Sequence, residues 1–375
     1  MAITEATLPR SKRPRIREVD MSRAMGIMTM VLAHSFLIYP IDILNRPGFY
    51  EFNKWIVDWN MELLNLVSGS CFYCINYKKY INRKIDRIFI PYLIFGFIAL
   101  LLHASASSLI NQHNDIMYGI RNLLFSGGNY WFLYTIFMIF VIYPWLIKVF
   151  DKPWKEVALV VLLFAISDLF VPLLKEAGIH TNILCFKRVA YHMPYFILGR
   201  YAVKYIAEYN KITWRQAIPI VLVCIGVYYL SNQLILHKPL YVAKNGGFAS
   251  FSAYYTAWYR FLRSMSVIVP VYIVIIYLLR AVDSGNRIAK PIFNVMKKCS
   301  QYSLQIYLFD AFWMTAIRTV LCNVLHITNP FVILFFMVSV NLTLTITLCD
   351  YVLKRNKTVA WLTGLGRRPW LKPEN

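Results

Sequence analysis

Ten stretches of apolar residues, each close to the length that crosses a bilayer, constrain the fold of this chain more than any other feature. They fall at residues 22–40, 55–75, 88–109, 130–149, 156–174, 190–206, 214–233, 263–281, 302–322 and 331–353. A helix needs about 20 such residues to span the hydrocarbon core. Because a segment in lipid must satisfy its own backbone hydrogen bonds, we expect an all-α bundle of about ten transmembrane helices.

The composition excludes a soluble globule. Hydrophobic residues make up 58% of the 375 residues and charged residues only 15%, which leaves too little polar surface to cover a soluble core. The formal net charge of +22 is dispersed over the loops between the apolar segments. This charge is typical of topology signals and of attraction to anionic lipid headgroups, so we expect membrane lipids and no nucleic acid as partners.

Basic residues collect at alternate ends of the predicted helices. They precede the first segment and follow the second, sixth, eighth and tenth: Arg10, Lys12, Arg13, Arg15 and Arg17; Lys78, Lys79, Arg83, Lys84 and Arg87; Arg200, Lys204, Lys211 and Arg215; Arg280, Arg287, Lys290, Lys297 and Lys298; Lys354, Arg355, Lys357, Arg367 and Arg368. The positive-inside rule then places both chain ends in the cytoplasm. We therefore divide the chain into a basic N-terminal segment (1–21), a membrane domain (22–353) and a basic cytoplasmic tail (354–375).

Arg23 and His34 are the residues of the first segment that most suggest a functional site. They are eleven positions apart, which on a helix returns the histidine to within about 20° of the arginine's face and about 16 Å further along the axis. In a soluble protein, a histidine on an apolar face is usually a packed core residue. At bilayer depth an ionisable side chain is costly to bury and usually marks a site, so we expect both to face one interior cavity.

The basic run Arg83-Lys84-Ile-Asp-Arg87 is expected at the start of the third helix. Cations and free N–H groups at a helix start can together hold a pyrophosphate. The simpler interpretation is that these residues signal topology. Cys71 and Cys74 have the spacing of a metal or redox pair but no second pair or histidine beside them, so we expect helical packing and no metal site.

Six stretches, taken in order, resemble the membrane acyltransferase-3 family. Asp20-Met-Ser-Arg23 with His34-Ser35 resembles the family's first helix, which carries Asp-x-x-Arg and a histidine with ten residues between arginine and histidine. The others are Asn60-Met-Glu62 to Ser68-Gly69, Lys84-Ile-Asp-Arg87 with Pro91-Tyr92, Tyr130-Trp131-Phe132-Leu133, Met193-Pro194-Tyr195-Phe196 to Gly199, and Ser303 to Tyr307 and Asp310. Asp310 stands where the family usually has a histidine, so no role is assigned to it.

The resemblance implies a ten-helix enzyme of the bacterial cytoplasmic membrane that moves an acyl group, most often acetyl, from cytoplasmic acyl-CoA to a hydroxyl of a cell-surface polysaccharide or its lipid-linked precursor. His34 would take the proton of the hydroxyl, or would itself carry the acyl group. Arg23, Lys84 and Arg87 would hold the CoA phosphates. Arg23 as an interfacial, snorkelling residue is the simpler alternative.

Four further side chains complete the predicted site. Glu62 would orient His34 by accepting its other ring N–H, or would pair with a buried cation. Trp131, Tyr195 and His192 would contact the acceptor sugar, although packing or an aromatic belt is the simpler explanation of these residues. The competing hypothesis is a transporter or flippase of a lipid-linked sugar, with His34 and Glu62 as a proton relay. A catalytically inactive export partner would have lost Arg23 and His34.

Overall fold

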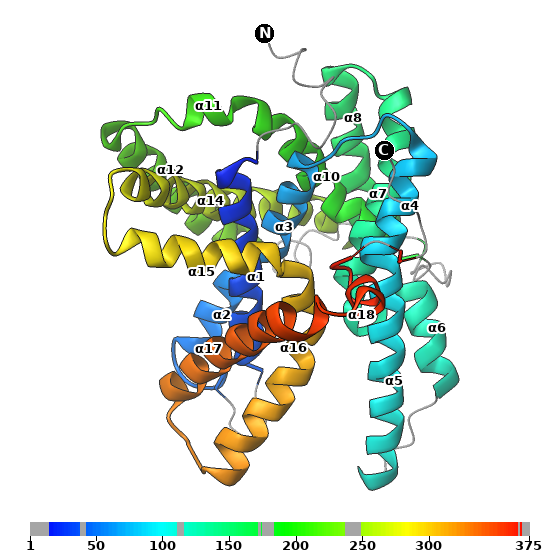
Figure 1. Ribbon diagram of the computed structural model, residues 1–375. Coiled ribbons are helices and arrows are strands. Elements are labelled where there is room, and N and C mark those ends of the chain that lie inside the picture. The colour runs from blue at the N-terminus through cyan, green and yellow to red at the C-terminus, as the bar shows by residue number, and fades with distance from the viewer. Residues whose placement is uncertain are drawn as a thin grey trace.

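The computed structural model describes residues 15–37, 43–110, 116–171, 174, 184–236, 249–366 and 368–369. Every regular element among these residues is a helix (Figure 1), which confirms the all-α prediction. Five helices in the described part are long and apolar enough to cross a membrane: Tyr77–Leu102, Ile116–Val149, Trp214–Leu234, Thr256–Asp283 and Pro330–Leu353. The chain is therefore an integral membrane protein. The count of ten spans and the side of the chain ends stay predictions.

Each of the ten apolar segments contains a helix, and further helices lie between and after them. The helices of the first half are α1 (Arg17–Ser35), α2 (Phe49–Val57), α3 (Asn60–Ser70), α4 (Tyr77–Lys84), η3 (Ile85–Phe89), α5 (Ile90–Ile110), α6 (Ile116–Ser126), η4 (Gly128–Tyr130), α7 (Trp131–Val149), α8 (Pro153–Ala165) and η5 (Ile166–Phe170). In the second half they are α10 (Phe186–Ala202), η6 (Val203–Tyr205), α11 (Ile206–Tyr209), α12 (Trp214–Leu236), α14 (Ala249–Asp283), α15 (Ala289–Gln301), α16 (Ser303–Arg318), η7 (Thr319–Val324), α17 (Pro330–Leu348), η8 (Cys349–Leu353) and α18 (Lys357–Leu362). Residues 1–14 of the predicted N-terminal segment, 38–40 and 172–173 of the predicted spans, and 367 and 370–375 of the predicted tail lie outside the described residues.

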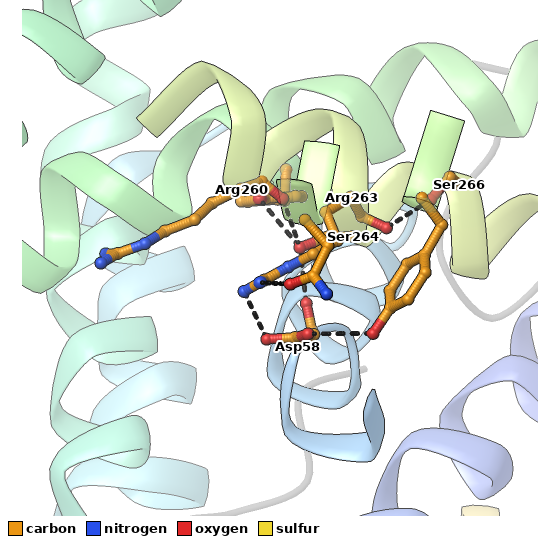
Figure 2. A network of polar contacts seen from close by, with 8 residues as sticks. Asp58, Arg260, Arg263, Ser264 and Ser266 are labelled. Atoms are coloured by element: carbon orange, nitrogen blue, oxygen red, sulfur yellow. Dashed lines mark hydrogen bonds and ion pairs between the residues drawn. The ribbon is translucent and has the colours of Figure 1, made fainter. Parts of the chain in front are cut away.

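The second predicted span is broken rather than continuous. Helix α2 ends before Asp58, and α3 begins after Trp59. The carboxylate of Asp58 accepts a hydrogen bond from Arg263 of α14 at 2.5 Å, and the Ser264 hydroxyl donates to the Asp58 carbonyl at 2.5 Å. Figure 2 shows this network, which also includes the Tyr228 hydroxyl. A buried carboxylate needs such partners, and the break between the helices lets Asp58 reach them.

The third predicted span begins earlier than expected. Helices α4, η3 and α5 run on continuously from Tyr77, and the side chain of Asn76 caps the start by accepting from the Lys79 N–H at 3.0 Å. The first turns are basic, so apolar length alone did not reveal them. The π-helical segment η3 carries Asp86 and Arg87; such segments often occur at functional positions because they shift the faces of the following helix.

Helix α1 lies at the centre of the bundle and packs against α3, α15, α16 and α17. Next to it, α3 and α10 approach closely at Gly69 and Gly199, where a Cβ on either residue would overlap a backbone carbonyl of the opposite helix. Both glycines belong to the resembling stretches. The helix that carries Arg23 and His34 is thus held on several sides, which is what a positioned site requires.

The chain does not end at the last long helix. After η8, the side chain of Asn356 caps the short helix α18 by accepting from the Thr358 N–H at 2.9 Å. In Figure 1 this red helix lies between α16 and α5, and it packs against α5 and η3. The described part of the predicted tail is therefore docked on the membrane domain.

Candidate active site

Arg23 and His34 lie on one helix, as the spacing predicted. Both belong to α1, with Arg23 in its first half and His34 in its last turn. Eleven residues of α-helix separate them by about 16 Å along the axis. Each marks a distinct polar region, one basic and one built around the imidazole.

The basic region is a cavity of about 740 Å³ beside the first half of α1. Six cationic residues line it: Arg23, Lys79, Arg83, Lys84, Arg87 and Lys354. The described residues that line it include no carboxylate. Because six cationic side chains line one cavity, the cavity is suited to a polyanionic ligand. The structure thus brings Arg23, Lys84 and Arg87, chosen from the sequence, into one cavity.

Neighbouring groups fix several of these cations in place. The Arg23 guanidinium contacts Asp20 Oδ1 at 3.5 Å and Cys71 Sγ at 3.3 Å, which explains the Asp-x-x-Arg spacing within one helical turn. The Lys84 ammonium lies 3.4 Å from the centre of the Phe140 ring, a favourable contact between a cation and an aromatic face. These contacts hold the cations in position before any ligand binds.

Lys354 belongs to the same cavity but comes from the opposite end of the chain. It follows the last long helix and donates to the Tyr302 hydroxyl and to Asp350 Oδ1, the latter at 3.0 Å. The hydrogen bond with Tyr302, together with the nearby Asp350 carboxylate, raises the pKa of Lys354 above its ordinary value. The side chain therefore stays cationic at neutral pH.

The expectation of free helix N–H groups at Arg83–Arg87 was wrong. These residues lie inside the continuous α4–η3–α5 helix, where each N–H has an intrahelical partner. The helix start lies earlier, at Asn76, and Asn76 and Lys79 also line the cavity. Cationic side chains, rather than N–H groups beside them, supply the positive charge at Arg83–Arg87.

The second polar region is a chain of three side chains from three helices. The Nδ1 atom of His34 lies 2.5 Å from Asp310 Oδ2, and Asn341 Nδ2 donates to Asp310 Oδ1 at 2.8 Å. Asp310 comes from α16 and Asn341 from α17. Asp310 and Asn341 are buried, while the His34 side chain is 45% exposed. The imidazole is thus held by Asp310 at its Nδ1 atom, while part of the ring stays accessible.

This arrangement fixes which ring nitrogen of His34 is available. A carboxylate accepts hydrogen bonds, so Nδ1 carries the hydrogen and donates to Asp310, which leaves the lone pair on Nε2. A nearby carboxylate also stabilises the imidazolium that forms when Nε2 takes a proton. His34 with Asp310 therefore has the components of a general base. The sequence analysis did not select Asp310 or Asn341 for the site. Two signals were available: Asp310 stands where the family usually has a histidine, and Asn341 is a polar residue inside the last apolar segment.

Glu62 lies elsewhere in the bundle. It is buried on α3 with its Oε2 atom unpaired, and the charged groups acting on it are Asp58, Arg263 and Arg260. The carboxylate that meets His34 is Asp310. The structure therefore does not bring Glu62 and His34 together, and the acid in contact with the histidine is Asp310.

The residues predicted to contact the acceptor fall into two groups. Trp131 is half-buried, and its ring stacks on the His192 ring with 5.8 Å between the ring centres. The Arg188 guanidinium lies 4.7 Å from the centre of the Trp131 ring. Tyr195 is fully buried, packs on Phe261 and has its hydroxyl 3.5 Å from Ser264 Oγ. In this arrangement Trp131 retains an accessible part, while Tyr195 fills the core.

A family model described as an acyltransferase domain matches residues 16–350. The chain belongs to the acyltransferase-3 family. It is therefore an acyltransferase of the membrane, and its substrates include an acyl donor and an acceptor. No curated protein and no solved structure matches the chain significantly. Family membership favours the enzyme over the transporter hypothesis, whose proposed relay also lacks contact between His34 and Glu62.

Proposed function

We propose that this acyltransferase uses acyl-CoA, with acetyl as the acyl group, and transfers it to a hydroxyl of a cell-surface polysaccharide or its lipid-linked precursor. The observation that carries the proposal is the pairing on α1 of a six-cation cavity at Arg23 with a carboxylate-held imidazole at His34. The topology expected from the basic loops puts the cavity toward the cytoplasm, in the bacterial cytoplasmic membrane, where acyl-CoA is available.

The shape of CoA suits this separation. Its phosphates lie at one end and its thioester at the other, joined by the extended pantetheine arm. With the phosphates among Arg23, Lys84 and Arg87, the thioester points along α1 toward His34, about 16 Å away. Charge-assisted contacts from several cations give both affinity and orientation.

His34 then performs the proton transfer. Its Nε2 takes the proton of the acceptor hydroxyl while the oxygen attacks the thioester carbonyl carbon. The new C–O bond forms, the C–S bond breaks, and the departing CoA thiolate receives the proton from the imidazolium. Asp310 stabilises the imidazolium throughout, and Asn341 holds Asp310. An acyl-imidazole on His34 Nε2 is the alternative route with the same groups.

On the acceptor side, the proposal places the accessible part of Trp131 against the sugar, while the buried His192 is stacked on the same ring and supports it. Arg188 adds a positive charge over the Trp131 ring, where aromatic faces commonly stack on sugars. Tyr195 and Glu62 would act through packing and charge around this region rather than by touching the reacting atoms.

Mass spectrometry of surface glycans from cells with and without this protein tests the proposal. We expect the glycan to lose one acetyl unit per modified residue when the protein is absent, and to regain it with the wild-type chain. Unchanged glycan masses, with altered movement of a labelled lipid-linked sugar, would reject acyl transfer to a glycan.

A further inference from the structure

Residues 357–366 and 368–369, which we call the C-terminal strap, follow the last long helix. Helix α18 forms their first part, and a turn at Gly364 and Leu365 follows. Gly364 and Leu365 line the basic cavity beside Leu304 and Gln305 of α16. The strap is thus part of the cavity wall, although it lies beyond the residues 16–350 that the family model matches.

Three polar contacts anchor the strap to the helices that carry the cavity. Gln305 Nε2, itself buried, donates to the Thr363 carbonyl at 2.7 Å. Asp86 of η3 accepts from Trp361 Nε1 at 3.4 Å and forms an ion pair with Arg368 Nε at 2.5 Å. Asp86 stands between Lys84 and Arg87 in sequence, yet its carboxylate engages the strap. The Asp86 carboxylate therefore links the cation-bearing helix to the strap.

Gly364 is the residue that lets the strap lie so close. Its φ of +78° is in the region that side chains disfavour. A Cβ built there would lie 2.6 Å from Leu304 Cδ2, 2.9 Å from the backbone oxygen of Arg87 and 3.2 Å from Pro91 Cγ. The Arg87 oxygen belongs to the helix backbone and cannot move aside easily. A side chain at 364 would therefore push the strap away from the cation-bearing turn.

The opposite side of the strap is apolar. Val359, Leu362 and Thr363 line a second cavity of about 440 Å³ with Phe309 and Trp313 and other apolar residues of α5, α16 and α17. The strap therefore separates a polar space from an apolar one. If it moved, the apolar space would open toward the cation cluster, and the position of the cavity wall relative to the cations would change.

We propose that the C-terminal strap is a wall of the donor site and that its docking through Gly364 is required for donor binding. This inference rests on the proposed function, since it assumes that the basic cavity holds the phosphates of acyl-CoA. It assigns a positioning role to Gly364, Asp86 and Arg368, none of which supplies a charge to the described lining of the cavity.

The test is the binding of radiolabelled CoA to the full-length protein in nanodiscs, measured by equilibrium dialysis. Gly364→Ala is expected to raise the Kd for CoA at least about fivefold, because overpacking against backbone displaces the strap. Gly285→Ala is the matched control: Gly285 has the same backbone conformation, with φ +79°, but nothing lies within 4 Å of its built Cβ. Its Kd should stay at the wild-type value.

Hydrogen exchange gives a readout that does not depend on activity. The Leu365 and Gly366 N–H groups donate to the Ala360 carbonyl at 2.7 and 2.8 Å, and these amides should exchange faster in Gly364→Ala. Arg368→Gln, which removes only the ion pair to Asp86, should give a smaller rise in Kd of about two- to fivefold. This variant keeps the test decisive should Gly364→Ala fail to fold.

Each outcome bears on one of the two proposals. Weakened CoA binding in Gly364→Ala and Arg368→Gln, with Gly285→Ala unchanged, supports the strap as a wall of the donor site. Unchanged binding in both strap variants, while Arg87→Ala weakens it, overturns the strap proposal and leaves the donor site in place. Unchanged binding in Arg87→Ala as well would overturn the proposed donor site itself.

Discussion

Asp310→Asn is the substitution that most sharply separates a catalytic histidine from a packed one. The variant keeps the size of the side chain and can still accept from Asn341 through its amide oxygen. Its amide nitrogen then faces His34 Nδ1, where the carboxylate oxygen lies 2.5 Å away in the wild type. A donor at this position makes Nδ1 the acceptor, so the hydrogen moves to Nε2 and the base is lost.

The size of the effect follows from two contributions. A hydrogen bond to a charged group contributes about 1.5–3 kcal/mol, which corresponds to a loss of about 10- to 150-fold in rate when the imidazolium loses its carboxylate. The inverted tautomer adds to this, and at a comparable serine-protease histidine such a change costs about 10⁴ in kcat. We therefore expect kcat to fall by about 10²- to 10⁴-fold. The donor KM should stay near its wild-type value because Asp310 does not line the basic cavity.

The assay is transfer of labelled acetyl from acetyl-CoA by purified protein in nanodiscs, with thermal unfolding measured on the same samples. Asp168→Asn is the matched control, since Asp168 is equally buried but bonds to Ser167, away from His34. It should lose little activity. An Asp310→Asn enzyme with kcat within about threefold of wild type would refute the orienting role of Asp310, given that a lost base typically costs at least 10².

Three further substitutions probe the donor site, the residue that holds Asp310, and the break between α2 and α3. Arg87→Ala should raise the donor KM about tenfold or more and make it more salt-sensitive, whereas Arg215→Ala, outside the cavity, should leave it unchanged; equal effects would mean that the cavity is not the donor site. Asn341→Leu should lower kcat by about three- to tenfold by freeing Asp310, and full activity would contradict that role. Arg263→Leu strands the buried Asp58 carboxylate and should lower the free energy of unfolding by about 3–5 kcal/mol, seen as a lower Tm, while an unchanged Tm would show that Asp58 is held by other groups.

The sequence was sufficient for features that depend on local spacing. Apolar length predicted where helices lie, and helical geometry put Arg23 and His34 on one helix. The order of short motifs identified the family. These inferences succeed because each residue of a helix adds a fixed rise and rotation, so the spacing of Arg23 and His34 in the sequence determines their relative position on α1.

Contacts between distant parts of the chain could not be read in the same way. Asp310 is 276 residues from His34, and Asn341 is on yet another helix. The choice of Glu62 as the orienting acid followed from its presence in the second apolar segment, but the structure places it near Asp58, Arg260 and Arg263 and not beside His34. Nothing in local patterning specifies which face of a helix meets which neighbour.

The C-terminal segment shows a second limit. Its basic composition suggested a tail, because charge runs outside apolar spans are usually solvated. Yet Gln305 and Asp86 hold it against the membrane domain, and Lys354 enters the basic cavity. Only the three-dimensional structure shows that this C-terminal segment lies beside residues from the first third of the chain.

The rate of acyl transfer by His34→Gln at saturating donor tests directly whether His34 takes the proton of the acceptor hydroxyl. Glutamine retains a hydrogen-bonding group but takes up no proton at neutral pH, so we expect a loss of about 10²- to 10⁴-fold in the transfer of labelled acetyl from acetyl-CoA to glycan. The Kd for CoA should be unchanged, because the phosphates lie at the other end of α1. A glutamine variant that kept most of the wild-type rate would contradict both the base and the acyl-carrier role of His34.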